Sequence, residues 1–422
     1  MSAVSPASGQ VKQPHSSGFI LGNLAIGHAI SHWYNQSLFV ILPIIQDSLN
    51  FSNVQLGALS TIRNISSGVA NIPAGFAIDM AKNQWGLILT SCMFLSAISF
   101  TLVAFSPNYV ILAIVMVIVS VPGTLWHMPA IAAISQRFPE RRGFGLSIHG
   151  AGGNVGNIVG PLIAGALLGF MAWRQVTLFY VIPSLLVAAV VWWSLRDIGT
   201  SDAAPNEKKP LSTRVHDAGN LLRNRTILAL MLVIIIRTMG FNSLNVWVPK
   251  YLHDSVSKGG LGMGVLMVGL NTSLLTGLGV ISAPPLVFLS DRYGRKAVLI
   301  PGLAITALLA LAIGHAGDAL VLTLVILVIG LFTYSLAQIL QATVLDHINR
   351  GTEGAAMGLI LGSSGIIASF SPILAAVIVD EYGLSSVFYY NAALIAAAAA
   401  VLFLAPLKRP ARAPTQVKAP VG

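Results

Sequence analysis

The sequence predicts an all-α membrane protein in which twelve transmembrane helices form two pseudo-symmetric six-helix bundles. Of its 422 residues, 55% are hydrophobic and only 9% are charged, whereas about 25% of the residues of a soluble domain are charged. Long stretches carry no Asp, Glu, Lys or Arg, and the one from 83 to 136 has 54 residues. The two halves of the chain also repeat one another. These features exclude an ordinary soluble enzyme, a disordered chain and a collagen-like protein.

Twelve segments are long and apolar enough to cross a bilayer, which requires about 20 apolar residues per helix. The stretch from 83 to 136 supplies two of them. Two others are each interrupted by one arginine, Arg63 or Arg237. We expect the helices near residues 19–45, 53–79, 85–105, 109–136, 143–170, 174–196, 226–252, 261–290, 296–315, 319–347, 353–380 and 384–406.

Polar sequence divides these helices into two sets. The N-terminal residues are rich in Ser and Pro, and the one long polar break between helices has the composition of a linker. We therefore expect a disordered cytoplasmic N-terminus (1–18), an N-terminal six-helix bundle (19–196), a cytoplasmic linker (197–225), a C-terminal six-helix bundle (226–406) and a cytoplasmic tail (407–422).

The basic residues indicate how the chain crosses the membrane. If both termini are cytoplasmic, 19 of the 24 Lys and Arg residues face the cytoplasm and only Arg174, Lys250 and Lys258 face outward. This bias predicts a multi-pass protein of the plasma (inner) membrane with both termini inside. The net charge of +10 is then a consequence of topology, so we expect the lipid bilayer, and no nucleic acid, as the partner.

An internal repeat supports the division into halves. Residues 37–43 (SLFVILP) match 243–249 (SLNVWVP) at an offset of 206. Pro73 and Asp79 match Pro285 and Asp291 at 212, and Gly143 and Pro161 match Gly354 and Pro372 at 211. Two six-helix halves with the same orientation are the architecture of secondary transporters with parallel repeats.

A charged motif, Asp291-Arg292-Tyr293-Gly294-Arg295-Lys296, lies between helices eight and nine. It resembles the loop signature of the major facilitator superfamily, and the matching loop of the first half retains Gly75 and Asp79. The resemblance covers residues 20–406 and implies a transporter with this superfamily's fold. An aspartate can cap a helix and pair with arginine, so we expect Asp79, Asp291, Arg292 and Arg295 to latch the two halves on the cytoplasmic side.

The fifth predicted helix carries glycines at short intervals from Gly152 to Gly165. This stretch is similar to the Gly-rich fifth-helix motif of the superfamily's antiporters and to the Gly/Asn signature of its nitrate porters. We assign Gly156, Gly160 and Pro161 to the conformational gate. Close helix packing alone also explains the spacing, so the motif leaves the direction of transport open.

Shorter pieces resemble the fosmidomycin-resistance branch of the superfamily. They are His28 to Trp33, Trp126 to Pro129, Gly152 to Asn154, and residues 369–382. Members of that branch are similar to proton-driven drug exporters, so the resemblance implies efflux. All fourteen acidic residues fall at the ends of predicted helices or in loops. This departs from exporters that carry protons on a buried carboxylate and disfavours a cationic substrate.

The ionisable residues within the predicted spans are basic or neutral, and such residues in a membrane are functional candidates. Arg237 and Arg63 can bind a carboxylate, phosphonate or phosphate through planar guanidinium groups. His28, His32, His127 and His149 are candidates for proton coupling. Alternatively, Arg63 binds backbone carbonyls and the histidines fill structural roles. His32 and Asn35 are also candidates for substrate binding, and the superfamily resemblance adds cavity positions on helices seven and ten: Asn242, Asn245, Tyr334, Gln338 and Gln341.

Two functional hypotheses share this site. One is a proton-coupled secondary transporter that exports or exchanges a small anionic or amphiphilic compound, and the other is proton-coupled uptake of an organic or inorganic anion. No HExxH, P-loop or Cys pair is present, so we expect neither an enzyme nor an ATP-driven pump. The single Cys92 excludes an intrachain disulfide and a Cys-based metal site. We expect a monomer with no cofactor and no metal site.

Overall fold

The computed structural model describes residues 16–80, 84–196, 198, 223–348 and 353–407, without the side chains of 72–80 and 353–356. The described residues form helices joined by short loops, and none of them is in a strand. The first group is α1 (Ser17–Leu49), α2 (Asn53–Met80), α3 (Trp85–Phe105), α4 (Tyr109–Arg137), α5 (Arg142–Leu168), α6 (Trp173–Phe179) and α7 (Val181–Leu195). The second is α9 (Arg225–His253), η2 (Val256–Lys258), α10 (Val265–Gly277), α11 (Gly279–Tyr293), α12 (Arg295–Ile313), α13 (Ala319–Leu345), α14 (Glu353–Ala368), α15 (Ser371–Tyr382) and α16 (Ser386–Leu404).

Ten helical stretches of the described chain are long and apolar enough to span a membrane. They coincide with the third to twelfth predicted spans. The first two predicted spans correspond to α1, of 33 residues, and α2, of 28 residues. These two helices are more polar than the other ten, so the structure supports a multi-pass membrane protein while the count of twelve spans stays a prediction.

Proline and glycine divide three of the predicted spans. Pro183 cannot donate to the carbonyl of Phe179, where α6 ends, and Pro372 cannot donate to Ala368, where α14 ends. The third break, at Leu278 between α10 and α11, lies between two glycines. Each predicted single helix is therefore two shorter helices.

Several predicted boundaries differ from the structure by a few residues. Helix α1 begins at Ser17, inside the segment expected to be disordered, because the side chain of Ser16 accepts a hydrogen bond from the amide of Phe19 and caps the helix. It continues to Leu49 and ends at Asn50, which adopts the left-handed conformation. Helix α10 begins at Val265 rather than 261, because Gly262 has a positive φ of 61° and the chain turns there. The rest of 1–18 and most of the linker 197–225 lie outside the described residues.

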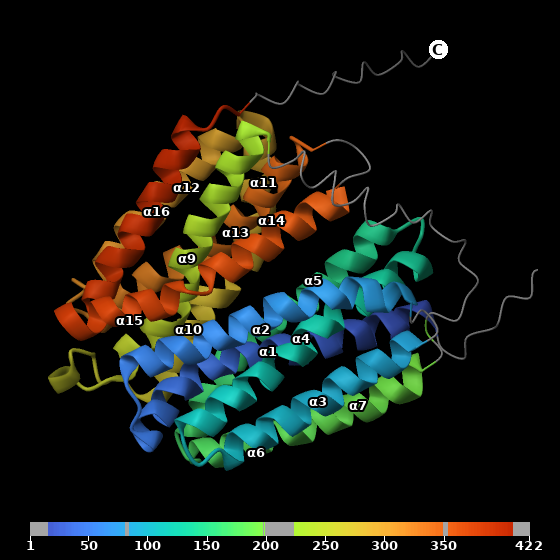
Figure 1. Ribbon diagram of the computed structural model, residues 1–422, viewed down its shortest axis with the longest axis horizontal. Coiled ribbons are helices and arrows are strands. Elements are labelled where there is room, and N and C mark those ends of the chain that lie inside the picture. Colours follow the sequence, from blue (N-terminus) through green and yellow to red (C-terminus); the bar gives the residue numbers. More distant parts are fainter. Residues whose placement is uncertain (1–15, 81–83, 197, 199–222, 349–352, 408–422) are drawn as a thin grey trace, which may run out of the picture.

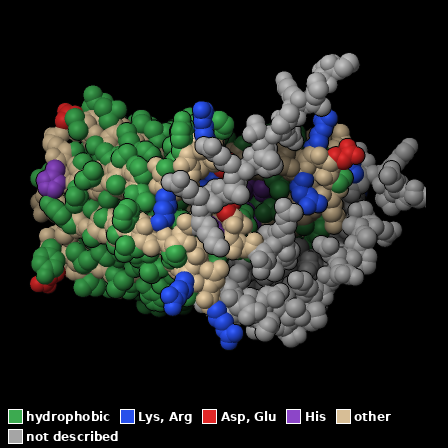
Figure 2. All heavy atoms as spheres, turned by 90° about the horizontal axis from the view of Figure 1, so that it is seen from above, with side chains coloured by type: hydrophobic (Ala, Val, Ile, Leu, Met, Phe, Trp, Pro, Cys, Tyr) green, Lys and Arg blue, Asp and Glu red, His purple; other side chains and the backbone are tan. Residues whose placement is uncertain are grey.

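The helices form two groups that lie side by side (Figure 1). We call α1–α7 the N half and α9–α16 the C half. We call the end of the molecule where α1 and α9 begin and α7 and α16 end the linker face. The opposite end, with the loops 50–52 and 254–264, is the Asp47 face. Seen from above, hydrophobic side chains cover most of the surface away from the linker face (Figure 2). Large hydrophobic side chains are exposed in both halves, among them Phe94, Leu186, Phe288 and Leu308, which suits contact with lipid.

Two glycines bring the halves into main-chain contact. A Cβ on Gly57 of α2 would lie 2.6 Å from the carbonyl oxygen of Pro372 in α15, and one on Gly269 of α10 would lie 2.5 Å from that of Pro161 in α5. Gly57 and Gly269 are 212 positions apart, and the two prolines 211. The offsets are those of the sequence repeat, so the contacts are related by the same pseudo-symmetry.

Hydrogen bonds beside these glycines repeat the symmetry. The hydroxyl of Thr61 donates to the carbonyl of Ser369 at 2.7 Å, and that of Ser273 donates to the carbonyl of Ile158 at 2.6 Å. Thr61 corresponds to Ser273 at the offset of 212, and Ile158 corresponds to Ser369 at 211. The α2–α15 and α5–α10 interfaces are therefore two copies of one contact.

Within the N half, the glycines of α5 fit against the backbone of α1. A Cβ on Gly156 would lie 2.1 Å from the carbonyl oxygen of Ala29, and one on Gly160 would lie 2.5 Å from that of Trp33. Small residues spaced by four allow this approach. The motif therefore packs α5 on α1, as the packing interpretation of its spacing predicts.

We predict that Gly156→Ala destabilises the protein, because its methyl group would overlap a main-chain carbonyl that cannot turn aside. The expected cost is about 1–3 kcal/mol, measured as a lower melting temperature in detergent. Gly150→Ala is the control in the same helix, since no atom lies within 4 Å of its Cβ position. Equal melting temperatures for the two variants would contradict the packing assignment.

Candidate functional site

The four histidines assigned to proton coupling lie together in the N half. The ring of His28, on α1, stacks on that of His149, on α5, with centroids 4.1 Å apart and an interplanar angle of 10°. His32 and His127 meet the His28 ring edge-on, at 4.6 and 4.8 Å. We call these four residues the histidine cluster. It joins α1, α4 and α5, and His28 and His149 are buried in it.

Small residues make room for the cluster. A Cβ on Gly153 of α5 would lie 2.6 Å from the His28 ring. Nδ1 of His28 donates to the carbonyl oxygen of His149 at 2.7 Å. The glycines of α5 therefore admit the imidazole rings as well as the α1 backbone, which places His28 and His32 against α5.

Asn157 extends the cluster toward the C half. Nδ1 of His32 donates to Oδ1 of Asn157 at 2.7 Å, and Nδ2 of Asn157 donates to the hydroxyl of Tyr334, on α13, at 3.4 Å. The hydroxyl of Thr276, on α10, donates to the backbone carbonyl of Asn157 at 3.0 Å. Asn157 is only 1% exposed, so a buried amide links the histidine cluster to the opposite half.

Arg237 lies at the far end of this chain of contacts. Its guanidinium donates to the backbone carbonyl of Thr333, next to Tyr334. It also lies over the Phe241 ring, 5.4 Å from the centroid, and that ring meets Tyr334 edge-on at 5.7 Å. Arg237 is therefore held beside Tyr334 by a carbonyl and an aromatic face.

Arg63 has similar partners in the N half. Its guanidinium donates to the backbone carbonyl of Asn35 at 3.1 Å and lies 4.7 Å from the centroid of the Phe39 ring. Asn35 is three residues from His32 on α1, and its own amide donates to the carbonyl of Ser31. In the part of the chain that the structure describes, neither Arg63 nor Arg237 forms an ion pair with a carboxylate.

The remaining predicted substrate contacts are more dispersed. Asn242 donates to the carbonyl of Ala368 at 3.2 Å, which satisfies the carbonyl that Pro372 leaves free. Asn245 is buried and its Oδ1 has no hydrogen-bond partner. Gln338 is exposed and Gln341 is half-buried. Tyr334 is the one of these five that the structure joins to the histidine cluster.

Among the described residues, the side chains of the charged loop contact groups of their own half. Arg295 pairs with Asp291, four residues before it, and with Asp346 at the end of α13, at 2.9 Å. Arg292 lies over the ring of Tyr293. These three partners belong to the C half, so a latch between the halves through the charged motif stays a prediction. The side chain of Asp79 lies outside the described residues. Gly156 and Gly160 contact α1 within the N half, whereas Pro161 faces Gly269 across the interface.

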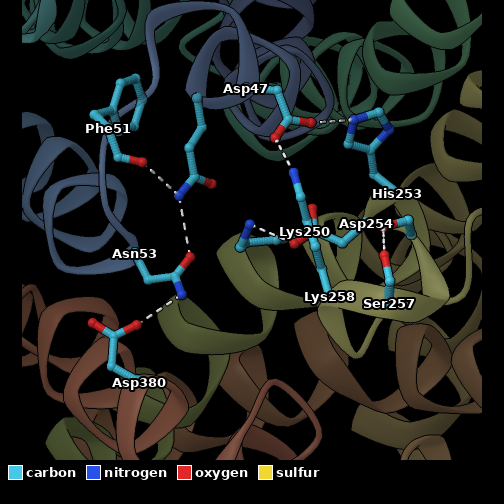
Figure 3. A network of polar contacts seen from close by, with 11 residues as sticks. Asp47, Phe51, Asn53, Lys250, His253, Asp254, Ser257, Lys258 and Asp380 are labelled. Atoms are coloured by element: carbon cyan, nitrogen blue, oxygen red, sulfur yellow. Dashed lines mark hydrogen bonds and ion pairs between the residues drawn. The ribbon is translucent and has the colours of Figure 1, made fainter.

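Ion pairs and a side-chain hydrogen bond join the halves on the Asp47 face (Figure 3). Asp47 at the end of α1 pairs with Lys258 at 2.8 Å and with His253 at 3.3 Å, and Asn53 of α2 donates to Asp380 of α15 at 2.8 Å. We call these five residues the Asp47 latch. They close the end of the molecule opposite the linker face.

The ion pair between Asp47 and Lys258 shifts the pKa of both side chains. Partial burial by itself would raise the pKa of Asp47, but the hydrogen bond and charge of Lys258 lower it below its usual value. The same pair raises the pKa of Lys258. Since the carboxyl pKa is lowered, the pair is fully formed at neutral pH and is lost only as the pH falls through that value.

No local motif marks the latch, because Asp47 and Lys258 are 211 residues apart. The sequence gives one indirect indication of the latch. Lys258 is one of three basic residues assigned to the outer side, and the same topology places Asp47 and Asp380 on that side. Asn157, in contrast, lies within the Gly-rich motif, and its partner Tyr334 was already a candidate. Sequence reasoning could not show that the two meet.

Comparisons with known proteins agree with this architecture. The family model described as Major Facilitator Superfamily matches residues 24–259 and 255–421. The chain is 23% identical to the Fosmidomycin resistance protein of Escherichia coli strain K12 over 307 residues, which covers 70% of this chain and 71% of that protein. It is 23% identical to Multidrug resistance protein MdtG of Proteus mirabilis strain HI4320 over 361 residues, 84% of this chain and 87% of that protein.

The fold is also that of a solved transporter. The crystal structure of the nucleoside transporter NupG matches with a TM-score of 0.75 and 15% sequence identity, over 91% of this chain and 98% of that one. The family match covers both halves, which are built on one repeated contact. This chain therefore belongs to the Major Facilitator Superfamily and is a multi-pass membrane transporter rather than an enzyme.

Proposed function

We propose that the chain is a proton-coupled secondary transporter that exports or exchanges a small anionic or amphiphilic compound by alternating access. The observation that carries the proposal is the pair of arginines, Arg63 and Arg237, which have no carboxylate partner among the described residues. Each donates a hydrogen bond to one backbone carbonyl, although a guanidinium has five N–H donors. The unused donors suit a carboxylate, phosphonate or phosphate.

The histidine cluster is the proposed proton site. It lies at one end of a hydrogen-bonded chain, His32 to Asn157 to Tyr334, that ends beside Arg237. A proton added to His32 changes the charge next to Asn157, which contacts both halves. Protonation in the N half can thereby alter a contact with the C half near the proposed anion site.

The closed Asp47 face supports alternating access. If the termini are cytoplasmic, as the distribution of Lys and Arg predicts, the latch closes the outside and the structure is an inward-facing state. Two relatives are named for resistance to fosmidomycin and to multiple drugs, and these names favour export. Uptake of an organic or inorganic anion by symport uses the same residues and is the alternative. In either case we propose a monomer, because the repeat completes the site within one chain.

We predict that anions raise the melting temperature of the wild type and that Arg237→Ala abolishes most of this effect. The panel contains phosphonates, phosphate esters, carboxylates and nitrate, together with neutral and cationic drugs. Loss of a charged hydrogen bond costs about 1.5–3 kcal/mol, so the affinity for an anion should fall about ten- to one-hundredfold. The affinity of Arg237→Lys for an anion should lie between those of the wild type and Arg237→Ala, because lysine keeps the charge without the bidentate geometry.

Arg174→Ala is the matched control for this experiment. Arg174 also donates to a backbone carbonyl, that of Ser106, and lies over an aromatic ring, that of Trp173. It lies near the Asp47 face, away from the proposed site. If anions stabilise the wild type and Arg237→Ala equally, or if only cations stabilise them, the anion site is wrong.

We predict that Asn157→Leu uncouples the proton gradient from transport. The substitution keeps the side-chain volume but removes both side-chain hydrogen bonds, while Arg237 stays in place. In proteoliposomes that contain the anion found above, flux driven by a pH gradient should fall at least about tenfold, with anion-induced stabilisation retained. Thr276→Val is the control, because it removes the hydroxyl that donates to the backbone carbonyls of Asn157 and Thr272 but leaves the Asn157 side chain in place. Unchanged gradient-driven flux in Asn157→Leu would exclude this residue from coupling.

We predict that Asp47→Asn opens the Asp47 face. An exposed ion pair contributes at most about 1 kcal/mol, so the open population should rise by no more than about fivefold. Spin labels on Phe170→Cys in the N half and Tyr382→Cys in the C half, in a Cys92→Ser background, report the separation. Both positions are exposed on this face. Asp318→Asn, a helix cap within the C half, should leave the distances unchanged, and an unchanged distribution in Asp47→Asn would show that the pair does not hold the face closed.

A further inference from the structure

The histidine cluster has nitrogen atoms that no protein contact explains. His28, His127 and His149 each offer one ring nitrogen, and the three nitrogens lie within 4.8 Å of one another. His28 is 7% exposed and His149 is 3% exposed. Nε2 of His28 and both ring nitrogens of His149 are buried without a hydrogen-bond partner. Burial of an unpaired polar group is costly, so these nitrogens point to a ligand.

Neighbouring hydrogen bonds orient two rings for ligation. Nδ1 of His28 donates to the carbonyl of His149, which leaves the lone pair of this imidazole on Nε2. Nδ1 of His32 donates to Asn157 in the same way. Histidines that bind metals usually donate their second ring N–H to a carbonyl or carboxylate, which fixes the tautomer and the direction of the lone pair. His28 therefore has the outer contact that is typical of a metal ligand, and His32 beside it has a similar contact.

The chemistry of these donors selects the ion. Imidazole nitrogens suit Zn²⁺, Cu²⁺ and Ni²⁺, whereas Mg²⁺ and Ca²⁺ prefer oxygen ligands. We propose that His28, His127 and His149 bind one divalent transition-metal ion of the zinc or nickel class. Three protein ligands leave a fourth position open, and His32 lies beside it, with its ring centroid 4.6 Å from that of His28.

Binding requires a small local rearrangement. Metal–nitrogen bonds of about 2.0–2.1 Å place tetrahedral ligand nitrogens roughly 3.4 Å apart. The stacked rings of His28 and His149 must therefore turn so that both lone pairs point at one ion. The ion would hold α1, α4 and α5 together within the N half. This proposal does not rest on the anion site, because none of the three ligands belongs to the C half.

The test is metal binding by the full-length protein after removal of any affinity tag. Isothermal titration with ZnCl₂ and NiCl₂ at neutral pH should give one ion per chain, whereas MgCl₂ should give no heat of binding. His127→Gln and His149→Gln should each weaken zinc binding at least about tenfold, since even the loss of a residue that only orients a ligand costs that much. His315→Gln is the control, because His315 is exposed and bonds to Tyr389 outside the cluster.

Two further measurements distinguish the loss of metal binding from misfolding of a variant and from failure of the anion site. The visible absorption of Co²⁺ added to wild-type protein reports nitrogen coordination without any substitution, so the proposal is testable even if a histidine variant does not fold. Arg237→Ala should bind zinc like the wild type, which separates this site from the anion site. The proposal is overturned if wild-type protein binds no zinc and gives no Co²⁺ spectrum, or if both cluster variants bind zinc as tightly as the wild type.

Discussion

The spacing between the two halves depends on two glycines. At Gly57 and Gly269 the main chain of one half lies against a proline carbonyl of the other, and any side chain there would push the halves apart. Because the two contacts are related by the sequence repeat, they act as a pair on either side of the pseudo-symmetry axis. The adjacent bonds of Thr61 and Ser273 follow the same relation. The Asp47 latch and the Asn157–Tyr334 contact can form only because these interfaces bring α1, α5 and α13 close together.

Many hydroxyl side chains in the described helices donate a hydrogen bond to a backbone carbonyl of their own helix. Ser31, Thr272 and Thr343 each donate to the carbonyl four residues earlier, as hydroxyl groups in apolar surroundings usually do. The histidine cluster, Arg63 and Arg237 differ, since their partners lie on other helices or are missing among the described residues. In a medium without water, an unpaired group of this kind is expensive. The candidate site is therefore the place where buried polar side chains depend on partners from other helices or have none among the described residues.

The sequence predicts what depends on local composition, and it fails where distance in the chain is large. Apolar length located ten spans. The repeat offsets relate Gly57 to Gly269 and Pro161 to Pro372, but they do not show that these glycines and prolines touch. The breaks at Phe179 and Ala368 were predictable from Pro183 and Pro372, because proline removes a donor four residues after a carbonyl. The motif supplies one partner of Arg295, Asp291, four residues before it, but only the packing of α13 against α11 and α12 brings Asp346 to the same guanidinium. The histidine cluster combines residues from three helices, so no spacing rule could indicate a metal site.

The strengths of the contacts differ within and between the halves, and this difference suits rigid-body motion. Inside the N half, α1 and α5 meet backbone to backbone at Gly156 and Gly160, and inside the C half Lys250 and Asp254 form a buried ion pair at 2.6 Å. Across the halves, the Asp47–Lys258 pair is partly exposed, and the amide of Asn157 is 3.4 Å from Tyr334, a long hydrogen bond. Exposed pairs contribute about 1 kcal/mol or less, whereas separating a buried pair costs several kcal/mol. Among the contacts across the halves, the Asp47–Lys258 pair and the Asn157–Tyr334 bond are therefore the ones that break first.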